Sequence, residues 1–474
     1  MLIFEDFTKD TLKKYTGYIK KSPLRCSDVS VGSFLMWNKG SNLQFAVINE
    51  TFISKRDYGD ETVFSFPYGK DENGAIDQLI EYVEQNDLAL TFYGVNDILF
   101  EKIKENPKLS AVMGGYERRW SDYIYDFEEM RTFSGGKFAG QRNHINKFIK
   151  HYGLPEFSAI TEDDLPKIKE FLLEYKEEHT QRFYIEESEL TSTEMMLEIF
   201  EQFGLYGGKL EINGKIIGFS IGEIVGDTLI IHIEKALRKY QGAYPTLFNR
   251  FVNFVYENSG ENLKFVNRED DSGDLGLRTS KLQYKPVFLL NKNLVKVNSP
   301  LYSIKKHPTL IGDGIVLDQI TEEDKQNYFA LCVDDEVNKL WGYDYKTDVF
   351  LPSDVNEDTF FDVQKHDNSI GYSINFAIRE TIGGELLGET IVYNFTYNRN
   401  AEMGCRLLKK AWGKKLGQKA YQMTLEWAEK VLNARITGKC FKQNIPSFKM
   451  ITYSGLTLFK EDEDFYYFKR KNIE

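Results

Sequence analysis

The sequence lacks any long hydrophobic run. No stretch reaches the roughly 20 apolar residues that a helix needs to cross a bilayer, and the most apolar pieces, such as residues 228–233, have the length of a strand. The N-terminus, MLIFEDFTKDTLKKY, also lacks the basic start and apolar centre of a signal peptide. The sequence therefore predicts a cytoplasmic protein without a membrane span.

Cysteine and proline are scarce in this chain of 474 residues. The four cysteines, at 26, 332, 405 and 440, form no C-x-x-C pair. This excludes a disulfide framework and the common zinc patterns, so we expect a reducing compartment and no metal. The 11 prolines stand beside 35 Phe and 28 Tyr, which excludes a disordered or collagen-like chain. The length predicts two or three domains.

An excess of positive charge is also missing. The 60 Lys and Arg against 72 Asp and Glu leave a formal charge of −12, which argues against binding of DNA through bulk charge. Two basic islands depart from this balance: residues 131–155 hold five basic residues and no acid, and residues 401–450 hold eleven against three. Each island is either a site for an anionic ligand or a solvated face balanced by acids elsewhere.

Strand-like and helix-like segments alternate along the chain. Residues 42–48 and 88–93 resemble strands, and residues 75–86 have apolar side chains at helical spacing. A short strand followed by a Thr-capped acidic helix start occurs twice, at Thr161 and at Thr321. A Ser-Pro turn signal near residue 300 marks a boundary. The alternation predicts an α/β fold (α+β mixed sheets) with helices on both faces.

The strongest chemical signal lies in residues 400–456. A strand ends near Leu407, a basic loop containing Gly413 follows, and a long helix then runs to about residue 432. A strand, a Gly-containing basic loop and a helix N-terminus together form an anion cradle, because free backbone N–H groups and the helix dipole favour negative charge there. Neither the Walker nor the Rossmann spacing is present. This chemistry indicates a phosphorylated cofactor, unless the glycines only close a tight turn.

Residues 310–470 resemble the GNAT superfamily of acyl-CoA N-acyltransferases, and most of all its branch of ribosomal-protein alanine acetyltransferases. The pieces that carry the resemblance, in order, are Glu402 and Gly404, Trp412-Gly413-Lys414, Gly417, Ala420, Asn444, Ser447, Gly455 and Leu456. Two residues depart from the pattern. Lys415 replaces the middle glycine of the loop, and Lys419 replaces a glutamate.

The resemblance implies that acetyl-CoA, or another acyl-CoA, enters a gap between two splayed parallel strands. Backbone groups near Leu407 and Leu408 would pair with the pantetheine, and Asn444 would bind its amide region. Ser447 would protonate the leaving thiolate, with Tyr453 as a second candidate acid, and Glu402 and Glu389 are candidate bases. The alternatives are ordinary strand positions for the two glutamates and a buried position for Tyr453. The expected pyrophosphate ligands are the amides of Trp412, Gly413, Lys414, Lys415 and Gly417.

Residues 1–300 resemble the uncharacterised family related to the C-terminal domain of phosphatidylglycerol lysyltransferases, which is built from two GNAT-like halves. Three segments carry the resemblance: residues 140–148, 232–244 and 266–281. The relatives of known activity move an amino acid from aminoacyl-tRNA to a lipid headgroup. The charged residues of these segments indicate a polar substrate pocket, or else a buried salt-bridge network. The predicted pocket residues are Arg142, Glu234, Asn267, Arg268, Arg278 and Lys281.

Strand alternation adds one expectation for residues 228–236. It places Ile231, Ile233 and Lys235 on one face and His232 and Glu234 on the other. A polar pair on one face of a central strand would line a cleft.

Together these patterns predict three GNAT-like folds, over residues 1–135, 136–300 and 301–474. The predicted activity is acyl transfer from acyl-CoA to an amine of a small molecule or peptide. The alternatives are aminoacyl transfer from aminoacyl-tRNA through residues 1–300, and a non-catalytic ligand-binding protein. The acceptor, the acyl chain and the oligomeric state are left open.

Overall fold

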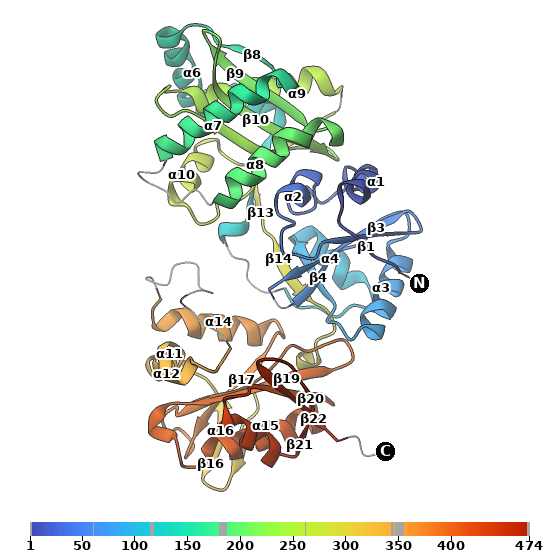
Figure 1. Ribbon diagram of the computed structural model, residues 1–474, viewed down its shortest axis with the longest axis vertical. Helices are drawn as coiled ribbons and strands as arrows, with labels where there is room; N and C mark the ends of the chain where they lie inside the picture. Colours follow the sequence, from blue (N-terminus) through green and yellow to red (C-terminus); the bar gives the residue numbers. More distant parts are fainter. Residues whose placement is uncertain are drawn as a thin grey trace. The chain divides into compact units, whose positions relative to one another are not determined.

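The computed structural model describes residues 2–59, 61–113, 118–179, 187–260, 262–342, 346 and 355–471. The chain forms two compact units. The first unit holds residues 1–79, 92–101 and 116–294, and the second holds residues 80–91, 102–115 and 295–474. Three sheets with parallel and antiparallel pairs lie in the described part (Figure 1). The predicted mixed α/β architecture is confirmed, whereas the boundaries at residues 135 and 300 stay predictions.

The first sheet has the strand order β1-β2-β3-β4-β6-β14, with β5 paired to β3. The predicted strand and helix near residues 44 and 75 are present, and the strand expected from residue 88 begins at Thr91. The strands are β1 Glu5–Asp6, β2 Gln44–Ile48, β3 Thr51–Tyr58, β4 Glu61–Ser65, β5 Tyr68–Gly69, β6 Thr91–Val95 and β14 Asn293–Lys296. The helices of this part are α1 Lys9–Ile19, α2 Val31–Met36, α3 Glu72–Gln85 and α4 Asp97–Glu105.

The second sheet has the order β13-β7-β12-β11-β10-β9-β8. Apolar side chains of α9 pack on one face, and those of α7 and α8 belong to the cluster on the other face. The strands are β7 Asp122–Asp126, β8 Glu156–Ala159, β9 Tyr206–Ile212, β10 Lys215–Val225, β11 Thr228–Ala236, β12 Phe265–Asn267 and β13 Phe288–Leu290. The helices are α5 Phe127–Thr132, α6 Ala139–Tyr152, α7 Leu165–His179, α8 Glu187–Ile199, α9 Ala243–Ser259 and α10 Leu275–Gln283.

The third sheet lies in the second unit and has the order β15-β16-β17-β18-β19-β20-β22-β21. Helices α15 and α16 pack on one face, while α11 and α14 cover part of the other (Figure 1). The strands are β15 Leu310–Gly312, β16 Ile315–Gln319, β17 Ile374–Arg379, β18 Gly388–Tyr393, β19 Asn400–Leu407, β20 Arg435–Phe441, β21 Leu456–Glu461 and β22 Phe465–Arg470. The helices are α11 Lys325–Val333, α12 Asp335–Asn338, α14 Glu357–Ser369, α15 Leu416–Val431 and α16 Ile445–Tyr453.

Both predicted Thr-capped helix starts are confirmed. The backbone N–H of Thr161 donates to Asp164 Oδ2 at 2.9 Å, and that of Thr321 donates to Asp324 Oδ2 at 2.8 Å. Each threonine side chain in turn caps the backbone N–H three residues on. These capping boxes satisfy N–H groups that a helix start leaves without intrahelical acceptors.

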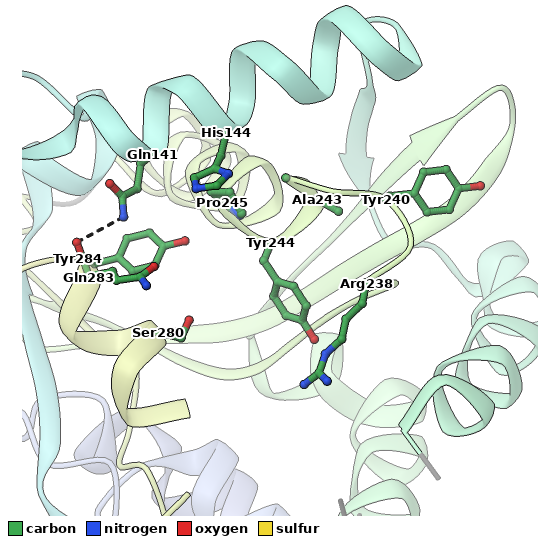
Figure 2. A pocket seen from close by; sticks show the side chains of 11 residues that line it. Gln141, His144, Arg238, Tyr240, Ala243, Tyr244, Pro245, Ser280, Gln283 and Tyr284 are labelled. Atoms are coloured by element: carbon green, nitrogen blue, oxygen red, sulfur yellow. Dashed lines mark hydrogen bonds between the residues drawn. The ribbon is translucent and has the colours of Figure 1, made fainter. Parts of the chain in front are cut away.

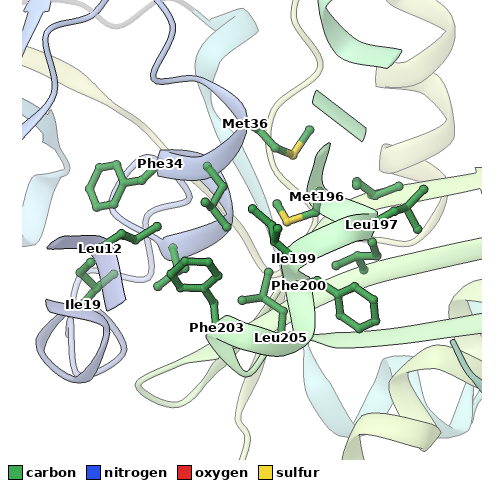
Figure 3. Close-up of a cluster of buried hydrophobic side chains, with 14 of the residues drawn as sticks. Leu12, Ile19, Phe34, Met36, Met196, Leu197, Ile199, Phe200, Phe203 and Leu205 are labelled. Atoms are coloured by element: carbon green, nitrogen blue, oxygen red, sulfur yellow. The ribbon is translucent and has the colours of Figure 1, made fainter. Parts of the chain in front are cut away.

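One apolar core joins the N-terminal helices to α8 within the first unit. Figure 3 shows side chains from α1 and α2, among them Leu12 and Phe34, in the same apolar cluster as Met196 of α8 and Phe203 of the turn that follows it. Leu12 and Met196 are fully buried. At about 25 cal/mol per Å² of apolar surface, such burial is the main stabilising contribution to the unit.

Within the described part of the chain, no helix combines the length and the apolar character needed to cross a membrane. The cytoplasmic location stays a prediction.

Candidate functional sites

The loop between β19 and α15 leaves a run of backbone amides unpaired. Across the described residues, no intramolecular acceptor is found for the N–H groups of residues 413–418, and the first N–H of the helix to find one is that of Lys419. Gly413 has φ 79° and Lys415 has φ 60°, so the chain turns twice through the left-handed region before α15 begins. Among the described residues, no side chain caps this helix start. Such a bare helix N-terminus is suited to bind an anion.

Lysines surround this loop, and their ion pairs are exposed. Lys410 pairs with Glu385 at 2.6 Å and Lys414 pairs with Glu380 at 3.2 Å. All four side chains keep about half of their surface in water, so each pair contributes little to stability. Breaking these ion pairs would therefore cost little free energy.

Strands β19 and β20 separate soon after they meet. They pair in parallel only from Asn400 to Glu402 on β19 and from Arg435 to Thr437 on β20. Beyond these positions β19 continues to Leu407 and β20 to Phe441 without pairing to each other. The two strands therefore diverge toward the end at which the basic loop and the start of α15 lie.

Two backbone groups near the end of β19 already have partners. The N–H of Leu408 donates to Leu387 O at 2.8 Å. The indole N–H of Trp412 donates to Leu407 O at 3.0 Å and holds the loop against the strand, with the ring 47% exposed. Pairing of residues 407 and 408 with a pantetheine stays a prediction.

Glu402 lies at the vertex where the strands part. Tyr393 Oη donates to its carboxylate at 3.2 Å and Asn394 Nδ2 donates at 3.3 Å. Lys439 Nζ is 3.9 Å away, and 28% of the glutamate side chain is exposed. A half-buried carboxylate with weak partners is able to accept a proton from an amine that reaches it.

Glu389 lies in a different environment. It is 1% exposed and accepts hydrogen bonds from Tyr328 Oη at 3.1 Å and Asn375 Nδ2 at 3.1 Å. Arg406 forms an ion pair with the Glu389 carboxylate at 2.5 Å. The Cys332 thiol lies beside this pair, and burial raises its pKa to about 12 although the positive charge of Arg406 acts in the opposite direction. These partners hold the Glu389 carboxylate in place, and its role as a base stays a prediction.

Helix α16 carries the remaining predicted residues. The side chain of Asn444 is the N-cap of α16 and accepts the backbone N–H of Ser447 at 3.1 Å. Tyr453 lies in the last turn with 70% of its surface exposed. Asn444 thus has a structural role as a cap, and the cofactor and acid roles given to these three residues stay predictions.

A pocket of about 280 Å³ lies in the first unit at the start of α9. Figure 2 shows that its side chains come from α6, from the loop that precedes α9, from the first turn of α9 and from the end of α10. Gln141 Nε2 bridges α6 to α10 through Gln283 O at 3.2 Å. The lining residues are Gln141, His144, Arg238, Tyr240, Gly242, Ala243, Tyr244, Pro245, Ser280, Gln283 and Tyr284.

The six residues predicted for this region are not among those that line the pocket. Arg268 pairs with Glu234 at 2.7 Å, and Arg278 pairs with Asp271 at 2.9 Å. Lys281 Nζ donates to Arg268 O at 2.6 Å. Asn267 Nδ2 bonds to Asp122 Oδ2 at 2.8 Å, and Arg142 donates to the carbonyls of residues 133 and 135. Their role as substrate ligands stays a prediction.

The Glu234–Arg268 pair lies directly behind the pocket. The guanidinium stacks 4.5 Å from the ring centroid of Tyr284, which lines the pocket, and 4.3 Å from that of Phe248. Arg268 Nη1 and Glu234 Oε2 are buried and have no partner within the described residues. Burial outweighs the opposing effect of Arg268 and raises the pKa of Glu234.

The expected alternation along β11 is wrong at His232. Ile233 pairs with Ile221 and Ile231 pairs with Gly222, so His232 is an extra residue in a β-bulge. Ile231 packs in the cluster of α9, whereas Ile233 packs in the cluster of α7 and α8. The bulge therefore sends residues 231 and 233, expected on one face, to opposite faces.

His232 is enclosed by two carboxylates. Its Nδ1 is 2.7 Å from Glu269 Oε1 and its Nε2 is 3.0 Å from Glu223 Oε1. Burial alone would lower the pKa of His232, but the hydrogen bonds to Glu223 and Glu269 outweigh it and raise the pKa to about 10. The imidazole is therefore charged at neutral pH.

The sequence contained a signal for the pocket, but the prediction considered mainly charged residues and missed it. Tyr240, Gly242 and Tyr244 belong to one of the segments that carried the family resemblance, yet no role was given to them. Gly242 has φ 91°, and a Cβ there would lie 2.6 Å from His144 O. A glycine required between a strand and a helix was the available clue.

Comparison with known protein families gives a match for each of the two parts of the chain in which the sequence showed a resemblance. Residues 20–295 match the family described as phosphatidylglycerol lysyltransferase, C-terminal. The chain belongs to this family. Residues 315–457 match the acetyltransferase (GNAT) domain. The two family resemblances and the predicted series of GNAT-like folds are thereby confirmed.

Individual relatives extend this finding. A solved structure of a conserved protein of unknown function from Bacteroides thetaiotaomicron is 29% identical and matches 63% of this chain and 100% of its own, with a TM-score of 0.57. A GNAT-family acetyltransferase from Bacillus anthracis is 18% identical and matches 34% of this chain and 97% of its own, with a TM-score of 0.29. An uncharacterised protein from Mycoplasmoides gallisepticum is 28% identical over 178 residues, which are 37% of this chain and 56% of that relative. The chain thus spans about half the length of this curated relative.

Proposed function

We propose that the second unit transfers an acyl group from acyl-CoA, in the first instance acetyl-CoA, to the amine of a small molecule or peptide. One observation carries the proposal: the unpaired amides of residues 413–418 lie at the start of α15, next to the end at which β19 and β20 diverge. The match of residues 315–457 to the GNAT domain supports it.

The loop would hold the pyrophosphate of the cofactor. Six successive amides and the dipole of the 16-residue helix α15 supply positive potential there. Lys410 and Lys414 add formal charge and give up only exposed ion pairs. The left-handed φ of Lys415 lets its backbone follow the turn that glycine would otherwise make. The substitution therefore changes the charge of the loop and keeps its path.

Glu402 would act as the base. When the amine nitrogen attacks the thioester carbon, a C–N bond forms and the C–S bond breaks, so that CoA leaves as a thiolate. The amine loses one proton, which Glu402 accepts directly or through water, and the thiolate gains one from Ser447 or from solvent. Glu402 is preferred to Glu389 because it is partly exposed at the vertex, whereas Glu389 is saturated by buried partners.

Titration calorimetry of acetyl-CoA against the full chain tests this proposal. We expect micromolar binding that weakens at least tenfold in Lys414→Glu, because the substitution places a carboxylate beside the pyrophosphate. Lys430→Glu, at the far end of the same helix, makes the same charge change and is the control. Equal weakening in both variants would remove the loop from the binding site, and no binding to the wild-type chain would overturn the proposal.

A second function is favoured by the pocket of the first unit. We propose that this pocket receives the aminoacyl end of an aminoacyl-tRNA, with the polar side chains of Arg238, Tyr244 and Ser280 on its wall as ligands. The family of residues 20–295 supports this assignment. Filter binding of aminoacyl-tRNA and of deacylated tRNA tests it. Ser280→Trp fills the pocket and should abolish the preference for the aminoacylated form, while Thr279→Trp, next to it on α10, should not.

A further inference from the structure

Tyr421 is a buried hydroxyl without a partner at the place where the third sheet opens. It lies on α15 and is 1% exposed. Its Oη is buried and has no hydrogen-bond partner within the described residues. An unsatisfied buried hydroxyl destabilises a fold by about 1–3 kcal/mol, so its presence calls for a compensating role.

The hydroxyl reaches the vertex of the diverging strands. A Cβ built on Gly438 would lie 2.7 Å from Tyr421 Oη. Gly438 directly follows Thr437, the last residue of β20 that pairs with β19. The absence of a side chain at residue 438 therefore makes room for the hydroxyl at the point where the two strands part.

The same face of α15 leads from the basic loop to this hydroxyl. Gly417 lies one helical turn before Tyr421, and a Cβ on it would lie 3.3 Å from Leu407 Cδ1 and 3.7 Å from Cys405 Sγ and from Met450 Sδ. Gly417 thus faces β19 on one side and α16 on the other. Gly417 and Tyr421 therefore lie on the same face of α15, one helical turn of about 5.4 Å apart.

We propose that the Tyr421 hydroxyl donates a hydrogen bond to the carbonyl oxygen of the bound acyl thioester. This inference rests on the proposed acyltransferase function of the second unit. Negative charge develops on that oxygen as the amine nitrogen bonds to the carbonyl carbon. When the C–S bond breaks, the oxygen electron pair re-forms the C=O bond and the negative charge leaves with the thiolate. Tyr421 keeps its proton throughout, and the proton lost by the amine goes to Glu402.

The chemistry of the site fits a donor rather than a base. Burial raises the pKa of Tyr421 above its usual range, and the nearby Cys405 and Tyr393 raise it further. The hydroxyl therefore keeps its proton at neutral pH. A fixed donor in a site from which water is excluded stabilises a developing oxyanion strongly, and loss of one such donor typically slows turnover by about 10²–10³-fold.

The test compares ligands with and without the carbonyl on the full chain. Acetonyl-CoA has a ketone carbonyl in place of the thioester carbonyl, and this carbonyl is not bonded to sulfur. CoA has no acyl group and therefore lacks that carbonyl. We expect Tyr421→Phe to bind CoA as the wild type does and to bind acetonyl-CoA at least fivefold more weakly. With ¹³C at the carbonyl, we expect a downfield shift of its signal on binding to the wild-type protein, and this shift should be lost in the variant.

Thr424→Val is the matched control. It also removes a buried hydroxyl that has no partner in the described part of the chain, three residues further along α15. It should leave both affinities and the carbonyl shift unchanged. If the wild type binds neither CoA nor acetonyl-CoA, the acyltransferase proposal itself fails. If CoA binds but the carbonyl shift is the same in Tyr421→Phe and wild type, only the role of Tyr421 is overturned.

Discussion

The segment from β11 to α9 in the first unit and the segment from β19 to α15 in the second follow the same path. Strand β11 pairs with the parallel strand β12 for three residues, and β19 does so with β20. Each helix then begins after a residue with positive φ, Gly242 at 91° and Lys415 at 60°, and neither start has a side-chain cap. The two segments differ in what occupies the space around them.

The loop before α9 is closed by its neighbours, whereas the loop before α15 is not. A Cβ on Gly242 would meet the backbone of α6 at His144, while a Cβ on Gly413 would have no heavy atom of the described chain within 4 Å. The N–H of Ala243 also has an internal acceptor, Tyr240 O. The same path thus serves a packed junction in the first unit and an exposed loop in the second.

The two units also differ in the side chains found beyond the three paired residues of each parallel strand pair. In the first unit the ion pair of Glu234 and Arg268 lies there between aromatic rings, whereas in the second the lone hydroxyl of Tyr421 lies there. Strand β11 has a bulge at His232, while the register of β18 and β19 is unbroken. A repeated backbone plan therefore carries two different chemical sites.

The largest expected effect comes from breaking the buried ion pair of the first unit. Glu234→Ala leaves the Arg268 guanidinium buried without its partner and should lower the free energy of unfolding by about 3–5 kcal/mol in urea titration. The double variant Glu234→Leu with Arg268→Met removes both charges and should recover most of this loss. A single variant as stable as the wild type would mean that the pair adds nothing to the fold.

The raised pKa of His232 predicts that the stability of the first unit depends on pH. Because the folded pKa of His232, about 10, lies above its usual value of 6.5, its contribution to stability is fully present below pH 6.5 and is lost as the pH rises through 10. Between pH 6.5 and pH 10, the free energy of unfolding of the wild type should fall by up to about 1.4 kcal/mol per pH unit more than that of His232→Gln. Urea midpoints at pH 6.5, 8 and 9.5 measure this difference, and parallel curves for the two proteins would contradict it.

The same substitution, glycine to alanine, should destabilise the closely packed loop before α9 more than the exposed loop before α15. Both Gly242→Ala and Gly413→Ala pay about 1 kcal/mol for a side chain in the left-handed region. Only Gly242→Ala also forces a Cβ against the backbone of α6, which should cost about 1–3 kcal/mol more. Calorimetric unfolding of the full chain checks the order of the two variants, and equal losses would refute the difference in packing.

The smallest expected effect is a gain. Lys415→Gly removes a side chain from a position at φ 60° and should raise the free energy of unfolding by about 1 kcal/mol. Lys419→Gly, an exposed position inside α15, should lower it by about the same amount. A loss in both variants, measured by thermal unfolding, would mean that the left-handed conformation of Lys415 is not strained.

The sequence by itself determined the features that depend on neighbouring residues. The capped starts at Thr161 and Thr321, the apolar spacing of α3 and the strand–loop–helix order around Gly413 were all predicted, because each depends on residues within four positions of one another. The two family resemblances came from short segments of the same kind. These local signals are sufficient to give the architecture and the position of the loop proposed to bind an anion.

Tertiary structure alone decided which side chains meet. The pocket depends on contacts between α6 and α10, such as that of Gln141 with Gln283, and the charge of His232 depends on Glu269. The saturation of Glu389 by Arg406, and the lone hydroxyl of Tyr421 against Gly438, depend on strand register and helix packing. One added residue in β11 reversed the expected faces, because side-chain direction in a strand follows its hydrogen-bond register rather than its residue count.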